Sequence, residues 1–304
     1  MIRVATGSVD NGCATIESME FTTLIEPPDL CANLNSPNWV VLDCRFDLAD
    51  PESGRRAFAA AHIPGAHYAD LNRELSAPID AASGRHPLPD PAQFAALVGA
   101  WGIDDQTQCI VYDDANSSIA ARAWWMLRWI GARRVAVLNG GLAAWRAAGA
   151  PVQISAARAP IARHFSADIQ PQLVVTTAQL TAALQQAGAV LVDARAAARF
   201  SGVTEPIDPV AGHVPGARNF PFAQNLQADG RFLSAAEVGR RWRKFLQGAD
   251  PGAVINMCGS GVTACHNLLS MEMAGMSGSK LYAGSWSEWI RDPTRPVARD
   301  DGAH

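Results

Sequence analysis

The sequence predicts an α/β protein made of two tandem domains, each with a parallel sheet flanked by helices. Short apolar runs typical of buried strands alternate with longer segments typical of helices. This order is expected when parallel strands are joined by helices that cover both faces of a sheet. The second half of the chain also repeats motifs of the first half in the same order, which indicates an internal duplication.

The first half contains three predicted strands, each followed by a predicted helix or turn. The strands are short apolar runs, and their lengths match buried strands better than helices. They cover residues 39–45, 108–112 and 134–138, and the predicted helices cover 89–101, a tryptophan-rich segment at 118–130 and a short segment through Trp145.

Matching motifs support the duplication. The run ending in Asp193-Ala194-Arg195 corresponds to Asp43-Cys44-Arg45 at an offset of 150, and the turn His213-Val214-Pro215-Gly216-Ala217 corresponds to His62-Ile63-Pro64-Gly65-Ala66 at 151. Gly275, Gly284 and Trp289 match Gly131, Gly140 and Trp145 at 144. A bridge without clear periodicity lies between the halves. We therefore expect an N-terminal extension over residues 1–20, a first domain over 21–160 and a second over 170–304.

The stretch 254–265 carries the most informative pattern. A short apolar run leads into Cys258, a Gly259-Ser260-Gly261 turn follows, and a predicted helix covers 263–273. Glycines let the backbone curl so that several N–H groups face one point, and the helix N-terminus adds its positive dipole there. A cysteine at that point is expected to be largely thiolate near neutral pH. A lone cysteine at a strand end is often a small core residue, but the two glycines favour a cradle for an anion or a second sulfur.

The two halves differ at this stretch. At the offset of 144, Cys258 falls on Asp114, and the first half reads Ala-Asn-Ser where the second has its glycine turn. Only the second domain is therefore expected to carry thiol chemistry.

Composition excludes several functional classes. The 304 residues are 48% hydrophobic and 18% charged, with a formal charge of −4, so no broad basic surface for nucleic acid is expected. No apolar run reaches the length of a membrane span, and residues 1–20 do not resemble a targeting segment. The six cysteines lack paired spacing, which predicts reduced thiols and a cytoplasmic location. No cluster has metal-ligand spacing, so no metal or other cofactor is expected.

With these motifs in hand, the chain resembles the two-domain rhodanese-like sulfurtransferases from about residue 21 to 299. The repeated Asp-x-Arg and His-x-Pro-Gly-Ala motifs carry the resemblance, together with Leu138-Asn139-Gly140-Gly141, the Cys258–Thr263 loop and Tyr282-Ala283-Gly284-Ser285-Trp286. Within that family, the loop Cys-Gly-Ser-Gly-Val-Thr is similar to that of the 3-mercaptopyruvate sulfurtransferases. Loops of thiosulfate sulfurtransferases carry basic residues instead.

The resemblance implies a mechanism and a set of site residues. Cys258 attacks the outer sulfur of a small donor, becomes a persulfide, and passes the sulfur to cyanide or to a thiol such as that of a thioredoxin-like protein. Ser260 relays a proton to the departing enolate, His62 assists from the first domain as acid or base, and Asp50 orients His62. The backbone N–H groups that hold the persulfide are expected at Gly259, Ser260, Gly261, Val262 and Thr263.

The donor's anionic end is expected to bind Arg199, which follows the Asp-x-Arg strand as in the family. Mercaptopyruvate enzymes have a second arginine about nine residues later, but this sequence reads Glu205-Pro206-Ile207-Asp208-Pro209 there. The second arginine is absent at its expected place, at a cost of about 1.5–3 kcal/mol of binding if nothing replaces it.

Several alternatives stay open at this point. His62 and His213 occupy matching turns, so both are candidates for a purely structural role, and Arg195 is expected to pair with a carboxylate. Cys265 and the tryptophans are expected to be packing residues. A thiosulfate-specific enzyme and a persulfide carrier for a partner protein remain alternatives. A cysteine phosphatase is disfavoured because alanine stands at position 264, where phosphate binding needs an arginine.

Overall fold

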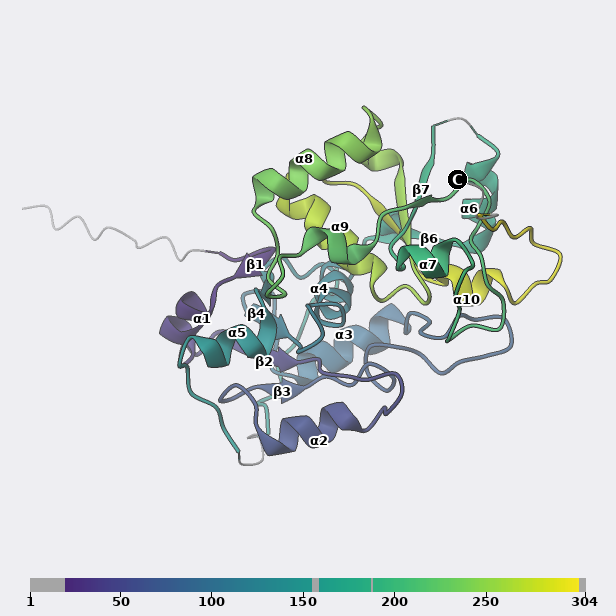
Figure 1. The fold of residues 1–304 in the computed structure, drawn as a ribbon. Helices are drawn as coiled ribbons and strands as arrows, with labels where there is room; N and C mark the ends of the chain where they lie inside the picture. Colours follow the sequence, from purple (N-terminus) through teal and green to yellow (C-terminus); the bar gives the residue numbers. More distant parts are fainter. Residues whose placement is uncertain (1–19, 155–158, 187, 301–304) are drawn as a thin grey trace, which may run out of the picture.

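The computed structural model describes residues 20–154, 159–186 and 188–300, so the predicted extension lies almost wholly outside the described residues. The chain forms two five-stranded sheets, and every strand pair in them is parallel. The strand orders are β1-β5-β4-β2-β3 and β6-β10-β9-β7-β8, so the second sheet repeats the topology of the first (Figure 1). The predicted fold class is confirmed.

The elements of the first domain follow the predicted order. They are β1 (Leu24–Ile25), α1 (Pro27–Asn33), β2 (Trp39–Asp43), α2 (Ser53–Ala60), β3 (His67–Tyr68), α3 (Pro91–Ala100), β4 (Gln108–Tyr112), α4 (Ala120–Trp129), β5 (Val135–Leu138) and α5 (Gly141–Ala147). Strand β4 is buried along its whole length, as its continuous apolar run predicts for a central parallel strand.

The second domain has the corresponding elements. They are η1 (Pro171–Leu173), β6 (Val174–Val175), α6 (Thr177–Leu184), β7 (Val190–Asp193), α7 (Ala197–Phe200), β8 (Arg218–Asn219), η2 (Phe222–Asn225), α8 (Ala235–Leu246), η3 (Pro251–Ala253), β9 (Val254–Met257), α9 (Ala264–Met273), β10 (Lys280–Tyr282) and α10 (Ser285–Trp289). No helix in the described ranges is long and apolar enough to cross a membrane.

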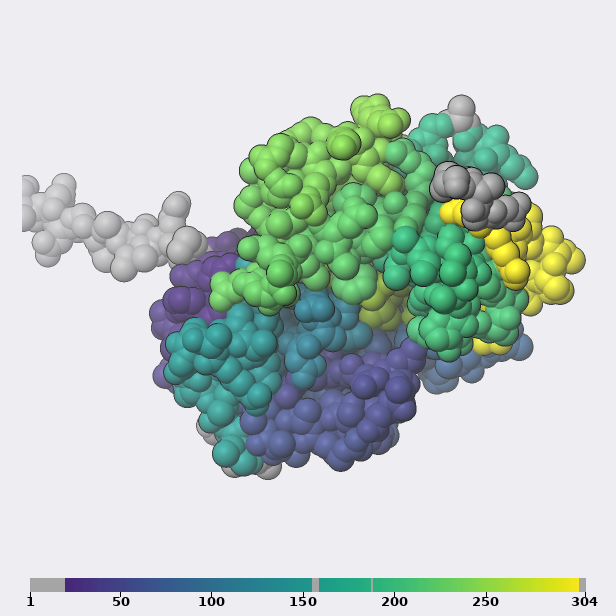
Figure 2. Space-filling view, in the orientation of Figure 1, coloured from purple at the N-terminus to yellow at the C-terminus, as the bar shows by residue number. Residues whose placement is uncertain are grey.

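The two domains share one hydrophobic core at their interface. Helix α4 packs against α9, and a single cluster of buried side chains includes Trp124 and Trp125 of α4 with Leu268 and Leu269 of α9. Figure 2 shows the two halves pressed together along a broad seam. Because this interface is continuous core, residues of the first domain are held rigidly against the second.

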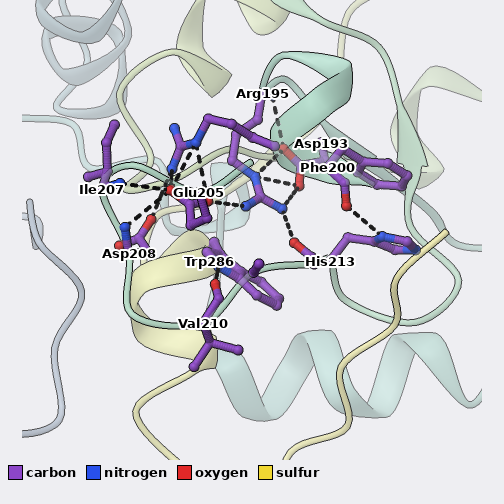
Figure 3. Close-up of polar contacts among 12 residues, drawn as sticks. Asp193, Arg195, Phe200, Glu205, Ile207, Asp208, Val210, His213 and Trp286 are labelled. Atoms are coloured by element: carbon purple, nitrogen blue, oxygen red, sulfur yellow. Dashed lines mark hydrogen bonds and ion pairs between the residues drawn. The ribbon is translucent and has the colours of Figure 1, made fainter. Parts of the chain in front are cut away.

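Both repeated motifs have the same structural role in each domain. Arg45 Nη2 binds Asp43 Oδ2 at 2.6 Å, and Arg195 Nη2 binds Asp193 Oδ2 at 2.7 Å. Each arginine also donates to a carbonyl that precedes the His-x-Pro-Gly-Ala turn. The expectation that Arg195 pairs with a carboxylate is therefore confirmed, and Figure 3 shows this pair.

Candidate active site

Cys258 lies directly after β9 and before α9, at the carboxyl edge of the second sheet. Its side chain is 2% exposed and borders a cavity of about 550 Å³. The cavity is lined from both domains, by residues that include Arg45, Phe46, Arg85, His86 and Asp114 of the first and Arg199, Ile207, Cys258, Gly259, Ser260, Val262 and Thr263 of the second. Ligands of open α/β sheets bind at this edge, so the cavity is the candidate active site.

The backbone of Cys258 is fixed by hydrogen bonds to the segment that begins at Ser285, and these bonds leave the N–H groups of the loop after Cys258 free to bind a ligand. The Cys258 N–H donates to Ser285 Oγ at 3.0 Å, and the Cys258 carbonyl accepts from the Trp286 N–H at 3.0 Å. Gly261 has φ of +76°, and a Cβ there would lie 2.2 Å from the Ala283 carbonyl oxygen, so this position requires glycine. Across the described part of the chain, no protein acceptor receives the N–H groups of residues 259–263.

The first domain contains the same cradle filled by its own side chain. Strand pairing aligns Tyr112 with Asp43 and Met257 with Asp193, so Asp113, not Asp114, occupies the position of Cys258. The prediction that placed Cys258 on Asp114 is wrong, because the loop before α4 is one residue longer than the loop before α9. The Asp113 carboxylate accepts four backbone N–H bonds at 2.8–2.9 Å, from residues 115, 117, 119 and 120. A loop of this type therefore binds an anion at the nucleophile's position.

A histidine from the first domain contacts the loop. His86 Nδ1 lies 2.8 Å from Ser260 Oγ, although the two residues are 174 positions apart in the sequence. Burial lowers the pKa of His86 to about 3, with further lowering by the cationic Arg122 and Arg85, so the imidazole is neutral at physiological pH. The predicted relay residue Ser260 thus has an acid–base partner that the sequence did not indicate.

Arg122 of α4 joins this histidine to the cysteine loop. The guanidinium is fully buried, and it donates to the carbonyls of Gly261 at 3.3 Å, His86 at 3.3 Å and Leu75 at 3.4 Å. Burial lowers the pKa of Arg122, while the nearby Cys265 and Cys258 act in the opposite direction. Arg122 is therefore a positioning residue that fixes the His86 segment against the loop.

The structure does not bring His62 or Asp50 to the cavity. His62 is fully buried, its Nδ1 lies 2.7 Å from the Phe58 carbonyl, and its ring stacks on Phe58. His213 has the same arrangement with Phe200, which Figure 3 shows. Asp50 forms an ion pair with Arg56 at the surface. Neither His62 nor Asp50 lines the cavity. His62 supports its own turn, and His86 is the histidine that contacts the Cys258 loop.

Arg199 does line the cavity, in a cluster with acidic residues. Its Nη2 lies 2.7 Å from Glu205 Oε1 and 3.1 Å from Asp208 Oδ2. Arg85 of the first domain reaches the same Asp208, with Nη1 at 2.5 Å from Oδ1. Figure 3 shows the Glu205 and Asp208 carboxylates close together. The residue found where the second arginine was expected is thus a carboxylate.

The remaining cysteines are consistent with packing roles. Cys265 is fully buried, its Sγ donates to the Gly261 carbonyl at 3.3 Å, and burial raises its pKa to about 12. Burial also raises the pKa of the Cys44 and Cys109 thiols, and the described cysteines are all free. Within the described ranges, no group of three or more metal-ligating side chains is placed to hold a metal ion.

Comparison with known proteins settles the family. A model of the rhodanese-like domain matches residues 26–148 and again residues 176–292. The chain belongs to the rhodanese-like family. Among its family relatives, a Pseudomonas aeruginosa protein named "Probable 3-mercaptopyruvate sulfurtransferase" is 49% identical over 286 residues, which cover 93% of this chain and 100% of the relative. A thiosulfate sulfurtransferase from Cricetulus griseus is 36% identical, over 84% of this chain and 86% of the relative.

A solved rhodanese structure agrees with this result. The 3-mercaptopyruvate sulfurtransferase of Escherichia coli superposes with a TM-score of 0.76 and 31% identity, covering 88% of this chain and 99% of that one. The resemblance inferred from the sequence motifs is confirmed. The exact domain boundaries 160 and 170 stay predictions.

Proposed function

We propose that this protein transfers a sulfane sulfur from 3-mercaptopyruvate, through a persulfide on Cys258, to a thiol or to cyanide. The observation that carries the proposal is the convergence of three features on one cavity. Cys258 stands at the unfilled counterpart of the Asp113 cradle, a neutral Ser260–His86 pair lies beside it, and arginines line the same wall. Each feature corresponds to one requirement of the reaction.

In the first half-reaction, the Cys258 thiolate attacks the sulfur of mercaptopyruvate. An S–S bond forms, the C–S bond breaks, and the bonding pair leaves as the enolate of pyruvate. The proton of the donor's thiol is transferred through the Ser260 hydroxyl and His86 to the enolate carbon, so pyruvate leaves with a methyl group and Cys258 holds an anionic persulfide. The lowered pKa of His86 disfavours a free imidazolium, so the imidazole takes up and returns the proton in concert with the Ser260 hydroxyl.

In the second half-reaction, the cradle holds the persulfide until an acceptor arrives. The N–H groups of residues 259–263 and the N-terminus of α9 stabilise the negative outer sulfur, as the corresponding groups stabilise Asp113. An acceptor thiolate or cyanide attacks the outer sulfur, the S–S bond breaks, and Cys258 returns as thiolate.

Thiosulfate is the second candidate donor, because rhodanese-like relatives carry that name as well. The loop Gly259-Ser260-Gly261 has no basic side chain, and both wall arginines are already paired with carboxylates. Because the positive charge of the arginines is already neutralised by these carboxylates, the site favours a singly charged carboxylate donor over a compact dianion.

Steady-state sulfur transfer to cyanide tests the proposal, with mercaptopyruvate and thiosulfate compared on wild type and on Cys258→Ser. The proposal expects a preference for mercaptopyruvate of more than about tenfold in kcat/KM and no transfer by Cys258→Ser. A preference for thiosulfate overturns the donor assignment. No transfer from either donor, with persulfide movement only to a protein thiol, favours the carrier alternative. A thioredoxin-like acceptor and a cytoplasmic location stay predictions.

A further inference from the structure

Two arginine side chains from different domains meet beside the nucleophile. Arg85 comes from the segment between β3 and α3, whereas Arg199 belongs to α7. A Cβ placed on Gly259 would lie 3.1 Å from Arg85 Nη2 and 3.6 Å from both Nη1 and Nη2 of Arg199. Both guanidinium groups therefore border the same point, one residue after Cys258.

Contacts with the second domain hold Arg85 in this position. Its backbone N–H donates to Ser287 Oγ at 3.0 Å, and the Ser83 carbonyl accepts from Arg291 Nε at 3.1 Å. At Gly84, a Cβ would lie 2.6 Å from the Gly284 carbonyl oxygen, so glycine permits this close approach. The segment 83–86 is thus a wall of the site and delivers Arg85 and His86 together.

Gly259 has a role that its backbone conformation does not explain. Unlike Gly261, it is not among the glycines with positive φ, so an alanine would suit its backbone. The space above it is instead bordered by the two guanidinium groups. The missing side chain keeps open a pocket that faces both arginines.

The cluster around this pocket is electrically balanced before any ligand binds. Arg85 and Arg199 both bind Asp208, Arg199 also binds Glu205, and the two acidic side chains are each 3% exposed. Arg195 also binds Glu205 and is paired with Asp193, so three cations and three anions give a formal charge of zero. An incoming anion must therefore share the guanidinium groups with the Asp208 carboxylate.

We infer that Arg85 supplies, from the first domain, the second arginine that holds the donor's carboxylate, and that Asp208 makes this subsite selective for a singly charged carboxylate. The inference rests on the proposed function and specifies its donor-binding residues. A planar carboxylate accepts from Arg85 and Arg199 above Gly259. For a dianion the attraction to the arginines and the repulsion from Asp208 both double, so a cluster of zero net charge gives it little extra attraction. The cost of removing the ligand from water rises with the square of its charge, so the dianion binds less well.

Alkylation of Cys258 tests the subsite independently of sulfur transfer. Iodoacetate and iodoacetamide react with the same thiolate, but only iodoacetate carries a carboxylate, so the ratio of their rates reports recruitment by the arginines. The modified Cys258 peptide is quantified by mass spectrometry, which separates it from the exposed Cys31. We expect Arg85→Gln and Arg199→Gln each to lower the iodoacetate-to-iodoacetamide ratio roughly tenfold or more. Arg85→Lys is expected to retain part of it, and the surface variant Arg240→Gln to leave it unchanged.

Donor kinetics then test selectivity. For Arg85→Gln, KM for mercaptopyruvate should rise roughly 10- to 100-fold with a smaller change in kcat, and Asp208→Asn should shift kcat/KM toward thiosulfate about tenfold or more. Gly259→Ala should raise KM for mercaptopyruvate as Arg85→Gln does, because its Cβ occupies the space beside the two guanidinium groups. If the alkylation ratio is the same in Arg85→Gln as in wild type, the inference is overturned even if sulfur transfer is intact. If the ratio falls but neither donor is turned over, the subsite stands and the proposed function fails.

Discussion

Replacing His86 by alanine tests the proton relay most sharply, because the two candidate donors need protons differently. Mercaptopyruvate leaves an enolate carbon that must be protonated, whereas thiosulfate leaves sulfite, which departs as an anion. The His86 imidazole lies 2.8 Å from Ser260 Oγ, within direct transfer distance. Removing a positioned acid–base group costs about 10²–10⁴-fold in rate. We therefore expect His86→Ala to slow the mercaptopyruvate half-reaction by that factor and the thiosulfate half-reaction by less than about tenfold.

The assay is single-turnover release of pyruvate or sulfite from excess enzyme. The substitution keeps the His86 carbonyl that accepts from Arg122, so the wall segment stays anchored. The exposed His164→Ala is the matched control. Because the pKa of His86 is lowered to about 3, wild-type kcat should show no inflection near pH 6.5 from this group. Equal losses with both donors would show that His86 only shapes the loop, and no loss with either would refute the relay.

Three further predictions concern the loop and its support. Gly261→Ala should lower Tm, because alanine in a left-handed conformation costs roughly 1–2 kcal/mol. It should also reduce kcat about 100-fold, because the added Cβ displaces the loop from Ala283. Unchanged activity would show that the loop does not hold the persulfide. Cys265→Ala should keep sulfur transfer within about threefold, because this buried thiol stays protonated; a large loss would point to a redox partnership with Cys258. Burial lowers the pKa of His266 from 6.5 to about 3. Between these two pH values the unfolded state binds more protons than the folded state, so the free energy of unfolding falls by about 1.4 kcal/mol for each pH unit of acidification. Denaturant unfolding from pH 6.5 to 4 should show a shallower decline for His266→Phe.

Much of the fold followed from the sequence because local patterns determine it. The apolar runs at 39–45, 108–112 and 254–257 became β2, β4 and β9, and the glycine turn after Cys258 became the loop of the site. The offset of 144 between the domains holds after the Cys258 loop but is wrong by one residue at Cys258 itself. The loop before α4 has one residue more than the loop before α9, so the strands that precede these loops align at an offset of 145.

The missing site residues could not be predicted because they act across the domain interface. Arg85 and His86 lie in an irregular segment between β3 and α3, without periodicity, and their partners Asp208 and Ser260 are more than a hundred positions away. His62 was a candidate because of its motif, but its duplicate His213 makes the same contact in the matching turn of the second domain and does not line the cavity. That symmetry indicates a structural role for both histidines.

Intact-protein mass spectrometry after treatment with the donor tests whether Cys258 carries the transferred sulfur. Wild type incubated with mercaptopyruvate and no acceptor is expected to gain the mass of one sulfur atom, located on the Cys258 peptide and removed by cyanide. Cys258→Ser is expected to gain nothing, whereas Cys265→Ala is expected to behave as wild type. Pyruvate release without a sulfur adduct on Cys258, or an adduct that persists in Cys258→Ser, would show that Cys258 does not carry the transferred sulfur.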